Sequence, residues 1–99
     1  MQNWYTKSTD DLCRAILSLK TKEECRAFLE DICTIKEIQD ISQRLEVAQL
    51  LTRRVNYTAI SKQTGASTAT ISRVSKCCEY GTGGYKTVID RLNEEEQDA

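Results

Sequence analysis

The chain has 99 residues, a formal net charge of −1, and neither proline nor histidine, and this length predicts one small domain over residues 1–99. No apolar run approaches the ~20 residues that span a bilayer, and the N-terminus has no basic-then-apolar signal pattern, so a cytoplasmic protein without a membrane partner is expected. Without histidine an acyl-transfer triad lacks its usual base, and no Gly-rich phosphate loop or converging pair of carboxylates is evident, so the sequence predicts no enzyme.

Three amphipathic helices are predicted in the N-terminal half, over residues 9–19, 22–33 and 35–54. Each follows a polar residue that can cap its first turn, with an acid three residues later: Ser8 with Asp11, Thr21 with Glu24, and Thr34 with Glu37. Their apolar side chains recur at helical spacing, in the sets Leu12, Ile16 and Leu19; Cys25, Phe28, Leu29, Ile32 and Cys33; and Ile38, Ile41, Leu45, Ala48 and Leu51 or Thr52. Such helices pack either among themselves or against a second chain, and spacing alone does not decide which. Because a chain of this size buries a limited core, an obligate homodimer is expected.

A helix-turn-helix is predicted next. Asn56 caps a first helix over residues 57–64, and Gly65 ends it, because glycine accepts the left-handed backbone that a tight turn between two crossing helices requires. Ser67 then caps a second helix over residues 68–78. Four apolar side chains fall at the spacing of the motif's internal contacts: Ile60, Ala66, Ile71 and Val74.

The outward face of the second helix is small and polar, which suits close approach to base edges in a major groove. Residues 47–78 contain five basic residues and no acid, whereas residues 1–46 sum to −2 and residues 79–99 to −4. The predicted DNA contacts are Thr58, Lys62, Ser67, Thr68, Ala69, Thr70, Ser72, Arg73 and Lys76. Within this segment we expect contacts with bases from Thr68, Ala69 and Ser72. Contacts with phosphates are expected from Arg53, Arg54, Lys62 and Lys76. The alternative is a helical hairpin inside a bundle, with a solvated basic face.

The remaining residues predict a glycine-marked loop over 79–84, a short helix over 85–92 and a frayed acidic tail over 93–99. The cysteines match no zinc-site spacing, and they are Cys13, Cys25, Cys33, Cys77 and Cys78. The first three lie on apolar helix faces, where cysteine behaves as a small hydrophobic residue. The sequence therefore predicts neither a metal site nor disulfides.

Three stretches resemble the Trp repressor superfamily, and most closely its branch of small bacterial proteins of the YerC/YecD type. They are QRLEVA at residues 43–48, TGASTATISR at residues 64–73, and Tyr80-Gly81. The resemblance extends over roughly residues 10–92. It implies an all-α, Trp repressor-like helical array that forms an intertwined homodimer. Its two helix-turn-helix motifs would enter successive major grooves of a pseudo-palindromic operator.

The resemblance also implies a corepressor pocket, and here the match is partial. Arg44 and Arg73 resemble the two arginines that sandwich the indole ring of tryptophan, and Thr34 stands where a threonine helps to hold the ligand's backbone. Val74 replaces a glycine beside the second arginine, and Cys77 replaces a serine that meets the amino group. The alternative for the two arginines is a phosphate contact or a dimer salt bridge. Tryptophan is therefore not expected as a corepressor.

Together these features predict a sequence-specific DNA-binding transcriptional regulator, in the role of a repressor, whose partners are double-stranded DNA and a second copy of the chain. Two alternatives come from other classes. One is a helical module whose basic hairpin binds an acidic protein. The other is the DNA-binding part of a recombinase or transposase, which the short chain and the missing catalytic carboxylates disfavour.

Overall fold

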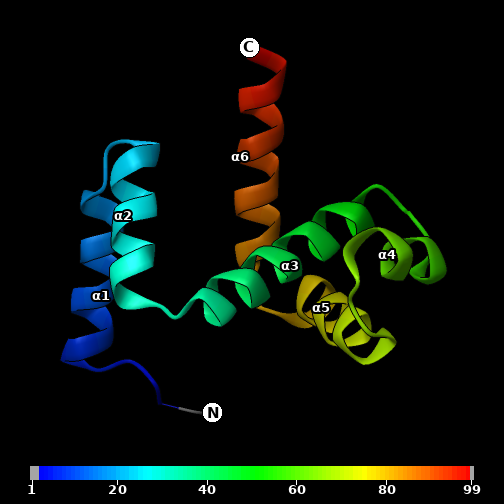
Figure 1. Cartoon of the computed structure of the whole chain (residues 1–99), viewed down its shortest axis with the longest axis horizontal. Coiled ribbons are helices and arrows are strands. Elements are labelled where there is room, and N and C mark those ends of the chain that lie inside the picture. The colour runs from blue at the N-terminus through cyan, green and yellow to red at the C-terminus, as the bar shows by residue number, and fades with distance from the viewer. Residues whose placement is uncertain (1–2, 99) are drawn as a thin grey trace. The chain divides into compact units, whose positions relative to one another are not determined.

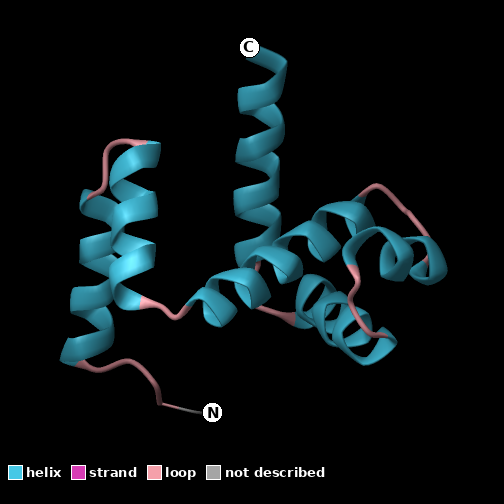
Figure 2. Ribbon diagram, in the orientation of Figure 1, coloured by secondary structure: helices cyan, strands magenta, loops and turns pink. Residues whose placement is uncertain are grey.

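The computed structural model describes residues 3–98, and in this range it contains six helices and no strand (Figures 1 and 2). The helices are α1 (Lys7–Ser18), α2 (Lys22–Ile32), α3 (Ile35–Thr52), α4 (Tyr57–Thr64), α5 (Thr68–Tyr80) and α6 (Gly84–Asp98). The predicted all-α class is confirmed. The chain divides into two compact units, the first ending at Ile38 and the second beginning at Gln39, and each is described by itself.

In the first unit, helix α1 begins two residues earlier than predicted, because Thr6 caps it in place of Ser8. The Thr9 amide donates to Thr6 Oγ1 at 3.2 Å and the Thr6 amide donates to Thr9 Oγ1 at 2.8 Å, which closes a reciprocal box and leaves Ser8 inside the helix. The Thr21 cap of α2 is confirmed, since the Glu24 amide donates to Thr21 Oγ1 at 3.1 Å. In a capping box the Glu24 carboxylate would accept from the Thr21 amide. It accepts instead from the amide of Lys20, one residue earlier, at 2.8 Å.

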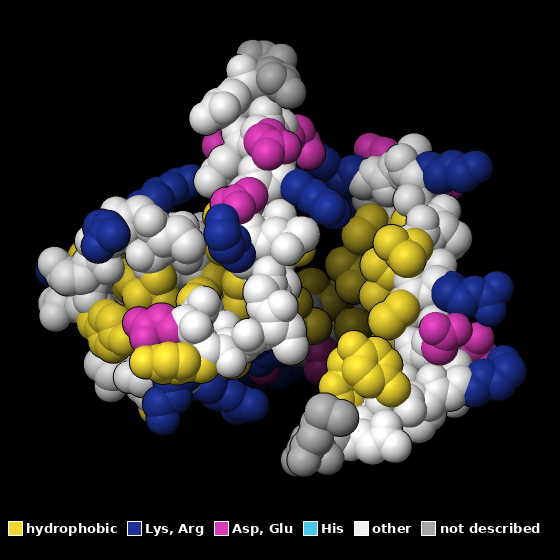
Figure 3. All heavy atoms as spheres, turned by 180° about the vertical axis from the view of Figure 1, so that it is seen from behind, with side chains coloured by type: hydrophobic (Ala, Val, Ile, Leu, Met, Phe, Trp, Pro, Cys, Tyr) yellow, Lys and Arg dark blue, Asp and Glu magenta, His cyan; other side chains and the backbone are white. Residues whose placement is uncertain are grey.

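Helices α1 and α2 bury none of their own side chains. In the space-filling view, hydrophobic side chains gather along this helix pair (Figure 3). The predicted stripe of α1 is only partly covered, because Leu12 remains 41% exposed and Ile16 52% exposed. Ile32 of α2 is likewise 52% exposed. The apolar spacing therefore predicts both helices, but their apolar side chains form no buried core within the first unit.

The second unit holds the buried core, which is made of Val47, Ala48, Ile60, Ala66, Ile71, Val74 and Ile89. The four inward residues predicted for the helix-turn-helix are all among them. The predicted stripe of α3 omits Val47, which is fully buried, while Ile41, which belongs to it, is 49% exposed in the single chain. Ile41 lines an open pocket between α3, α5 and α6 and stays accessible, whereas Val47 lies further along α3 and packs in the core with residues of α4, α5 and α6.

The last two helices are longer than predicted. α5 runs two residues further, to Tyr80, and α6 continues through most of the predicted frayed tail, because residues 93–97 contain good helix formers and no glycine or proline to stop it. The loop shrinks to residues 81–83. Its glycines are needed: a Cβ on Gly81 would lie 2.3 Å from the Cys77 carbonyl oxygen, and Gly83 has a φ of +87°. In the described residues no helix is long and apolar enough to cross a membrane.

Candidate nucleic-acid interface

The helix-turn-helix is built from local signals that the sequence predicts correctly. Asn56 Oδ1 accepts a hydrogen bond from the Ala59 amide at 2.9 Å at the start of α4. Gly65 adopts a φ of +76° and ends that helix, where a residue with a Cβ would be strained. Ser67 Oγ then accepts from the Thr70 amide at 3.1 Å and starts α5. The turn between the two helices is therefore defined by two capping hydrogen bonds and one left-handed glycine.

Side-chain hydrogen bonds fix this turn further, and the sequence analysis missed them. Ser61 Oγ donates to the Ala66 carbonyl at 2.8 Å, while Thr64 Oγ1 donates to the Ile60 carbonyl at 2.8 Å and accepts from the Ala66 amide at 3.1 Å. Gln43 of α3 donates to the Thr64 carbonyl at 3.1 Å and ties the turn to the long helix. The available signal for the bonds of Ser61 and Thr64 was two hydroxyl residues within four positions before the turn glycine.

The turn leaves the predicted recognition face open to solvent. All but one of its residues are exposed, namely Thr58, Lys62, Ser67, Thr68, Ala69, Ser72, Arg73 and Lys76. Thr70 is half-buried, and its hydroxyl lies 3.1 Å from Ser67 Oγ, so these two hydroxyls are already engaged in the cap. The side chains most available to a ligand on α5 are therefore those of Thr68, Ala69, Ser72, Arg73 and Lys76.

The positive charges of the five basic residues in this segment are not neutralised by nearby carboxylates of the described residues. Arg53, Arg54, Lys62, Arg73 and Lys76 are exposed, and none of them has a carboxylate within 4.0 Å in residues 3–98. An uncompensated basic surface around a small, polar helix face attracts a polyanion and lets it approach closely.

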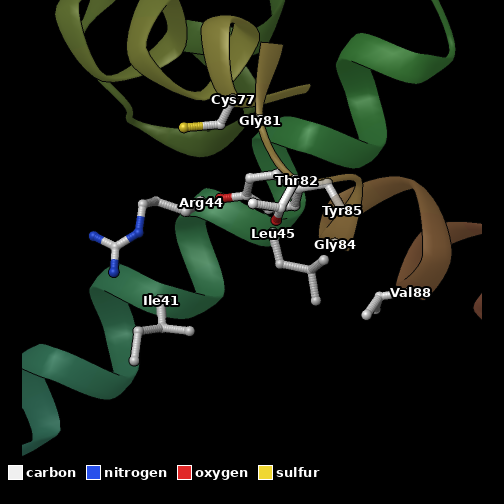
Figure 4. A pocket seen from close by; sticks show the side chains of 9 residues that line it. All are labelled: Ile41, Arg44, Leu45, Cys77, Gly81, Thr82, Gly84, Tyr85 and Val88. Atoms are coloured by element: carbon white, nitrogen blue, oxygen red, sulfur yellow. The ribbon is translucent and has the colours of Figure 1, made fainter. Parts of the chain in front are cut away.

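A pocket of about 610 Å³ opens beside the motif, between α3, α5 and α6. It is mostly apolar, and its lining residues are Ile41, Arg44, Leu45, Cys77, Gly81, Thr82, Gly84, Tyr85 and Val88. Figure 4 shows Arg44 extending from α3 and Cys77 from α5. Burial raises the pKa of the Tyr85 hydroxyl, Arg44 acts in the opposite direction, and Cys77 and Cys78 add to the increase. The pocket thus combines an apolar wall with one cation and one thiol.

Residues 7–93 match the family described as Trp repressor protein. The chain therefore belongs to the Trp repressor family. This is a family of regulatory DNA-binding proteins, so the predicted class of function and the predicted helix-turn-helix are confirmed. A curated relative, the uncharacterized protein YerC of Bacillus subtilis, is 50% identical over 93 residues, which cover 94% of this chain and 89% of YerC.

Two crystal structures from the same family resemble the chain closely. A Staphylococcus aureus protein, provisionally assigned as a Trp repressor, superposes with a TM-score of 0.87 at 44% identity, over 90% of this chain and 89% of that one. A TrpR-like protein from Eubacterium eligens superposes with a TM-score of 0.86 at 50% identity, over 89% of this chain and 91% of that one. The Trp repressor-like fold predicted from the sequence is therefore confirmed.

The structure brings together only part of the pocket that the Trp repressor resemblance implied. Arg44 and Cys77 line it, whereas Arg73 does not. Val74 is 1% exposed and belongs to the core. Thr34 lies in the first unit as the cap of α3: the Glu37 amide donates to Thr34 Oγ1 at 3.1 Å, and the Glu37 carboxylate accepts from the Thr34 amide at 2.8 Å. That reciprocal pair confirms the predicted capping box and engages the hydroxyl that a ligand would need.

The cysteines lie apart from any metal-binding arrangement. Within residues 3–98 no group of three or more His, Cys, Asp or Glu side chains could hold a metal ion, and all five cysteines are free thiols. Burial raises the pKa of the Cys78 thiol, and the neighbouring Cys77 and Glu79 raise it further. A neutral thiol packed against the core acts as a small hydrophobic group.

Proposed function

We propose that the chain is a bacterial transcriptional regulator that acts in the cytoplasm as a repressor. It binds a pseudo-palindromic operator as a homodimer through α4 and α5. The observation that carries the proposal is the exposed face of α5. It combines small and hydroxyl side chains with uncompensated basic residues, on a helix whose start and orientation are fixed by Gly65 and Ser67.

The two kinds of side chain on this face have different roles. Thr68, Ala69 and Ser72 are short enough to reach base edges, and they read the sequence. Lys62 and Lys76 are long and flexible, and they contact phosphates without regard to sequence. Ser67 and Thr70 act mainly through the backbone amides that they hold at the start of α5, because their hydroxyls bond to each other and to the Thr70 amide.

The exposed apolar side chains of α1 and α2 support the homodimer. In a single chain Leu12 is 41% exposed, and Ile16 and Ile32 are each 52% exposed, on helices that have no buried core of their own. Large exposed apolar surfaces of this kind mark protein–protein contacts. A second copy supplies the same surface again, as a two-fold symmetric interface requires.

The test is selection of bound sequences from a random duplex pool, followed by titration at two salt concentrations. Lys62→Ala and Lys76→Ala should weaken binding to all sequences alike and lower the salt slope by about one unit each. Ser72→Ala should change the selected sequence at a cost of ~1–3 kcal/mol on the native site. Lys20→Ala, which lies outside the motif, is the control and should change neither property.

Two outcomes would contradict this proposal. A selected sequence that stays the same in the Ser72→Ala and Thr68→Ala variants would show that α5 does not read bases. Duplex binding that is absent, or that does not weaken with salt, would favour an acidic protein as the partner of the basic motif.

Free tryptophan is not the corepressor in this proposal, even though Arg44 and Cys77 line a pocket. An indole ring beside Arg73 needs space that the side chain of Val74 fills, and Val74 cannot move aside without opening the core. Overpacking of this kind costs ~1–3 kcal/mol, which is a loss of roughly ten- to a hundredfold in affinity. The thiol of Cys77 adds to the loss, because it is a weak hydrogen-bonding group.

Calorimetry with the twenty amino acids tests this expectation alongside a DNA titration. Tryptophan should show no sub-millimolar binding and should leave the DNA affinity unchanged. Val74→Gly should create some binding if the steric reason is correct, and Cys77→Ser, which leaves the core intact, should improve it further. Sub-millimolar binding of tryptophan to the unmodified protein, with tighter operator binding, would overturn the expectation.

A further inference from the structure

A second cavity lies between the C-terminal end of α3 and the first turns of α6, and it is more polar than the pocket beside Arg44. Its volume is about 540 Å³, within the range of small-molecule sites. Its lining residues are Leu51, Thr52, Arg53, Arg54, Cys78, Tyr85, Lys86, Ile89, Asp90 and Asn93. The family resemblance assigns no role to this cavity.

The charge inside this cavity is positive. Lys86 Nζ lies 2.7 Å from Asp90 Oδ2, so the one carboxylate of the lining is already paired along α6. Arg53 and Arg54 contribute two further positive charges, and neither has a carboxylate within 4.0 Å in the described part of the chain. The net charge of the lining is therefore +2, from three cations and one anion. One bound dianion would neutralise it.

The floor of the cavity is apolar and partly desolvated. Ile89 is 2% exposed, and Leu51, Cys78 and Tyr85 pack against the core. Burial raises the pKa of both Cys78 and Tyr85, so neither adds a negative charge that would repel an anion at neutral pH. Charge pairs beside a desolvated floor interact more strongly than pairs surrounded by water.

The backbone at Arg54 gives a second and independent indication of function. Its φ of +61° makes it the one described residue other than glycine in the left-handed region. The position ends α3: the Arg54 amide donates to the Leu51 carbonyl at 3.0 Å and the Val55 amide to the Leu50 carbonyl at 3.1 Å. Glycine is the usual residue at this place in such a motif, because a Cβ there is strained. Arginine at this position costs stability relative to glycine, and backbone strain of this kind is common at functional sites.

We propose that this cavity binds a phosphoryl group, held by Arg53 and Arg54. The guanidinium group is planar and donates two parallel hydrogen bonds, which match the oxygens of phosphate. A phosphomonoester is favoured over a single carboxylate because its two negative charges balance the +2 of the lining, whereas a phosphodiester of DNA carries only one negative charge. The group belongs to a small phosphomonoester, whose remaining part rests on the apolar floor.

Arg54→Gly is a discriminating variant, because it removes the guanidinium and relieves the backbone strain at once. It should raise the melting temperature by roughly 4 °C and yet weaken phosphoryl binding by about tenfold. Arg53→Ala removes the neighbouring guanidinium without touching the strained position and should weaken binding to a similar extent. Arg26→Ala, an exposed arginine of α2, is the matched control and should leave the affinity unchanged.

The experiment has two arms, one with free ligands at constant ionic strength and one with DNA at two salt concentrations. Calorimetry with inorganic phosphate and adenosine monophosphate tests the free source, and titration of a random 20-base-pair duplex tests the DNA source. Weaker binding of either free ligand to Arg54→Gly and Arg53→Ala supports a phosphomonoester site. Unchanged binding of both free ligands, with a duplex salt slope lower by about one unit in both variants, would assign the two arginines to a DNA phosphate and rule out the phosphomonoester site.

The proposal is overturned if both variants keep the parent affinity for inorganic phosphate and adenosine monophosphate, or if Arg26→Ala loses as much as they do. Failure of the DNA-binding function is recognised separately, because the unmodified protein would then not bind duplex at all. The calorimetric arm with free ligands would remain valid in that case.

Discussion

Helices α1 and α2 carry apolar stripes comparable to those of α4 and α5, but the two pairs use them differently. α4 and α5 bury Ile60, Ile71 and Val74, whereas α1 and α2 bury no side chain. The reason is the number of neighbours within each unit. α3 and α6 add their own apolar residues, Val47, Ala48 and Ile89, to the core around α4 and α5. The comparison teaches that an apolar stripe predicts a helix but not what covers it.

The largest expected effect is on the free energy of unfolding, and it comes from a substitution in the core of the second unit. Ile60→Ala removes a fully buried side chain and should lower the free energy of unfolding by ~2–5 kcal/mol, because the cavity cannot collapse inside a close-packed core. Glu30→Ala on α2 is the control, since Glu30 is an exposed polar residue, and it should change stability by less than about 0.5 kcal/mol. Urea unfolding measures both. Equal losses would mean that the second unit does not hold the core that stabilises the protein.

The next effect tests what covers the first unit. Ile16→Asp should weaken the dimer about a hundredfold, or ~3 kcal/mol, because a charge at a buried interface loses its water without gaining a partner. Ser18→Asp adds the same charge to an exposed position of the same helix and should have little effect. Sedimentation equilibrium measures both. A folded monomer of the unmodified protein at micromolar concentration would break the comparison, because the exposed stripes would then have no second copy to cover them.

The smallest effect compares the caps of the two units. Asn56→Ala and Thr21→Ala each remove one side-chain acceptor at a helix start and should cost ~1 kcal/mol. The two variants should differ in how many helices show faster amide hydrogen exchange. Asn56→Ala should speed amide hydrogen exchange throughout α3–α6, because α4 shares their core, whereas the effect of Thr21→Ala should be confined to the first unit. A spread of the Thr21→Ala effect into α4 and α5 would show that the two units unfold together.

The sequence by itself determined the helices and the helix-turn-helix. Asn56, Gly65 and Ser67 act through hydrogen bonds and backbone angles within a few residues of themselves, so their roles can be recognised without knowing the rest of the fold. The same holds for the reciprocal pair of Thr34 and Glu37 at the start of α3. The errors also concerned local features. Thr6 caps α1 in place of Ser8, and α6 continues through the acidic residues after position 92 because no glycine or proline ends it there.

Only the tertiary structure decided which side chains are covered and where cavities form. The burial of Val47 and the exposure of Ile41 depend on which part of α3 the other helices reach, and the bond from Gln43 to the Thr64 carbonyl joins residues 21 positions apart. The cavity at Arg53 and Arg54 likewise depends on α6, which follows some thirty residues later in the chain. Helical periodicity reports neighbours within about one turn, so contacts between helices lie beyond what it can determine.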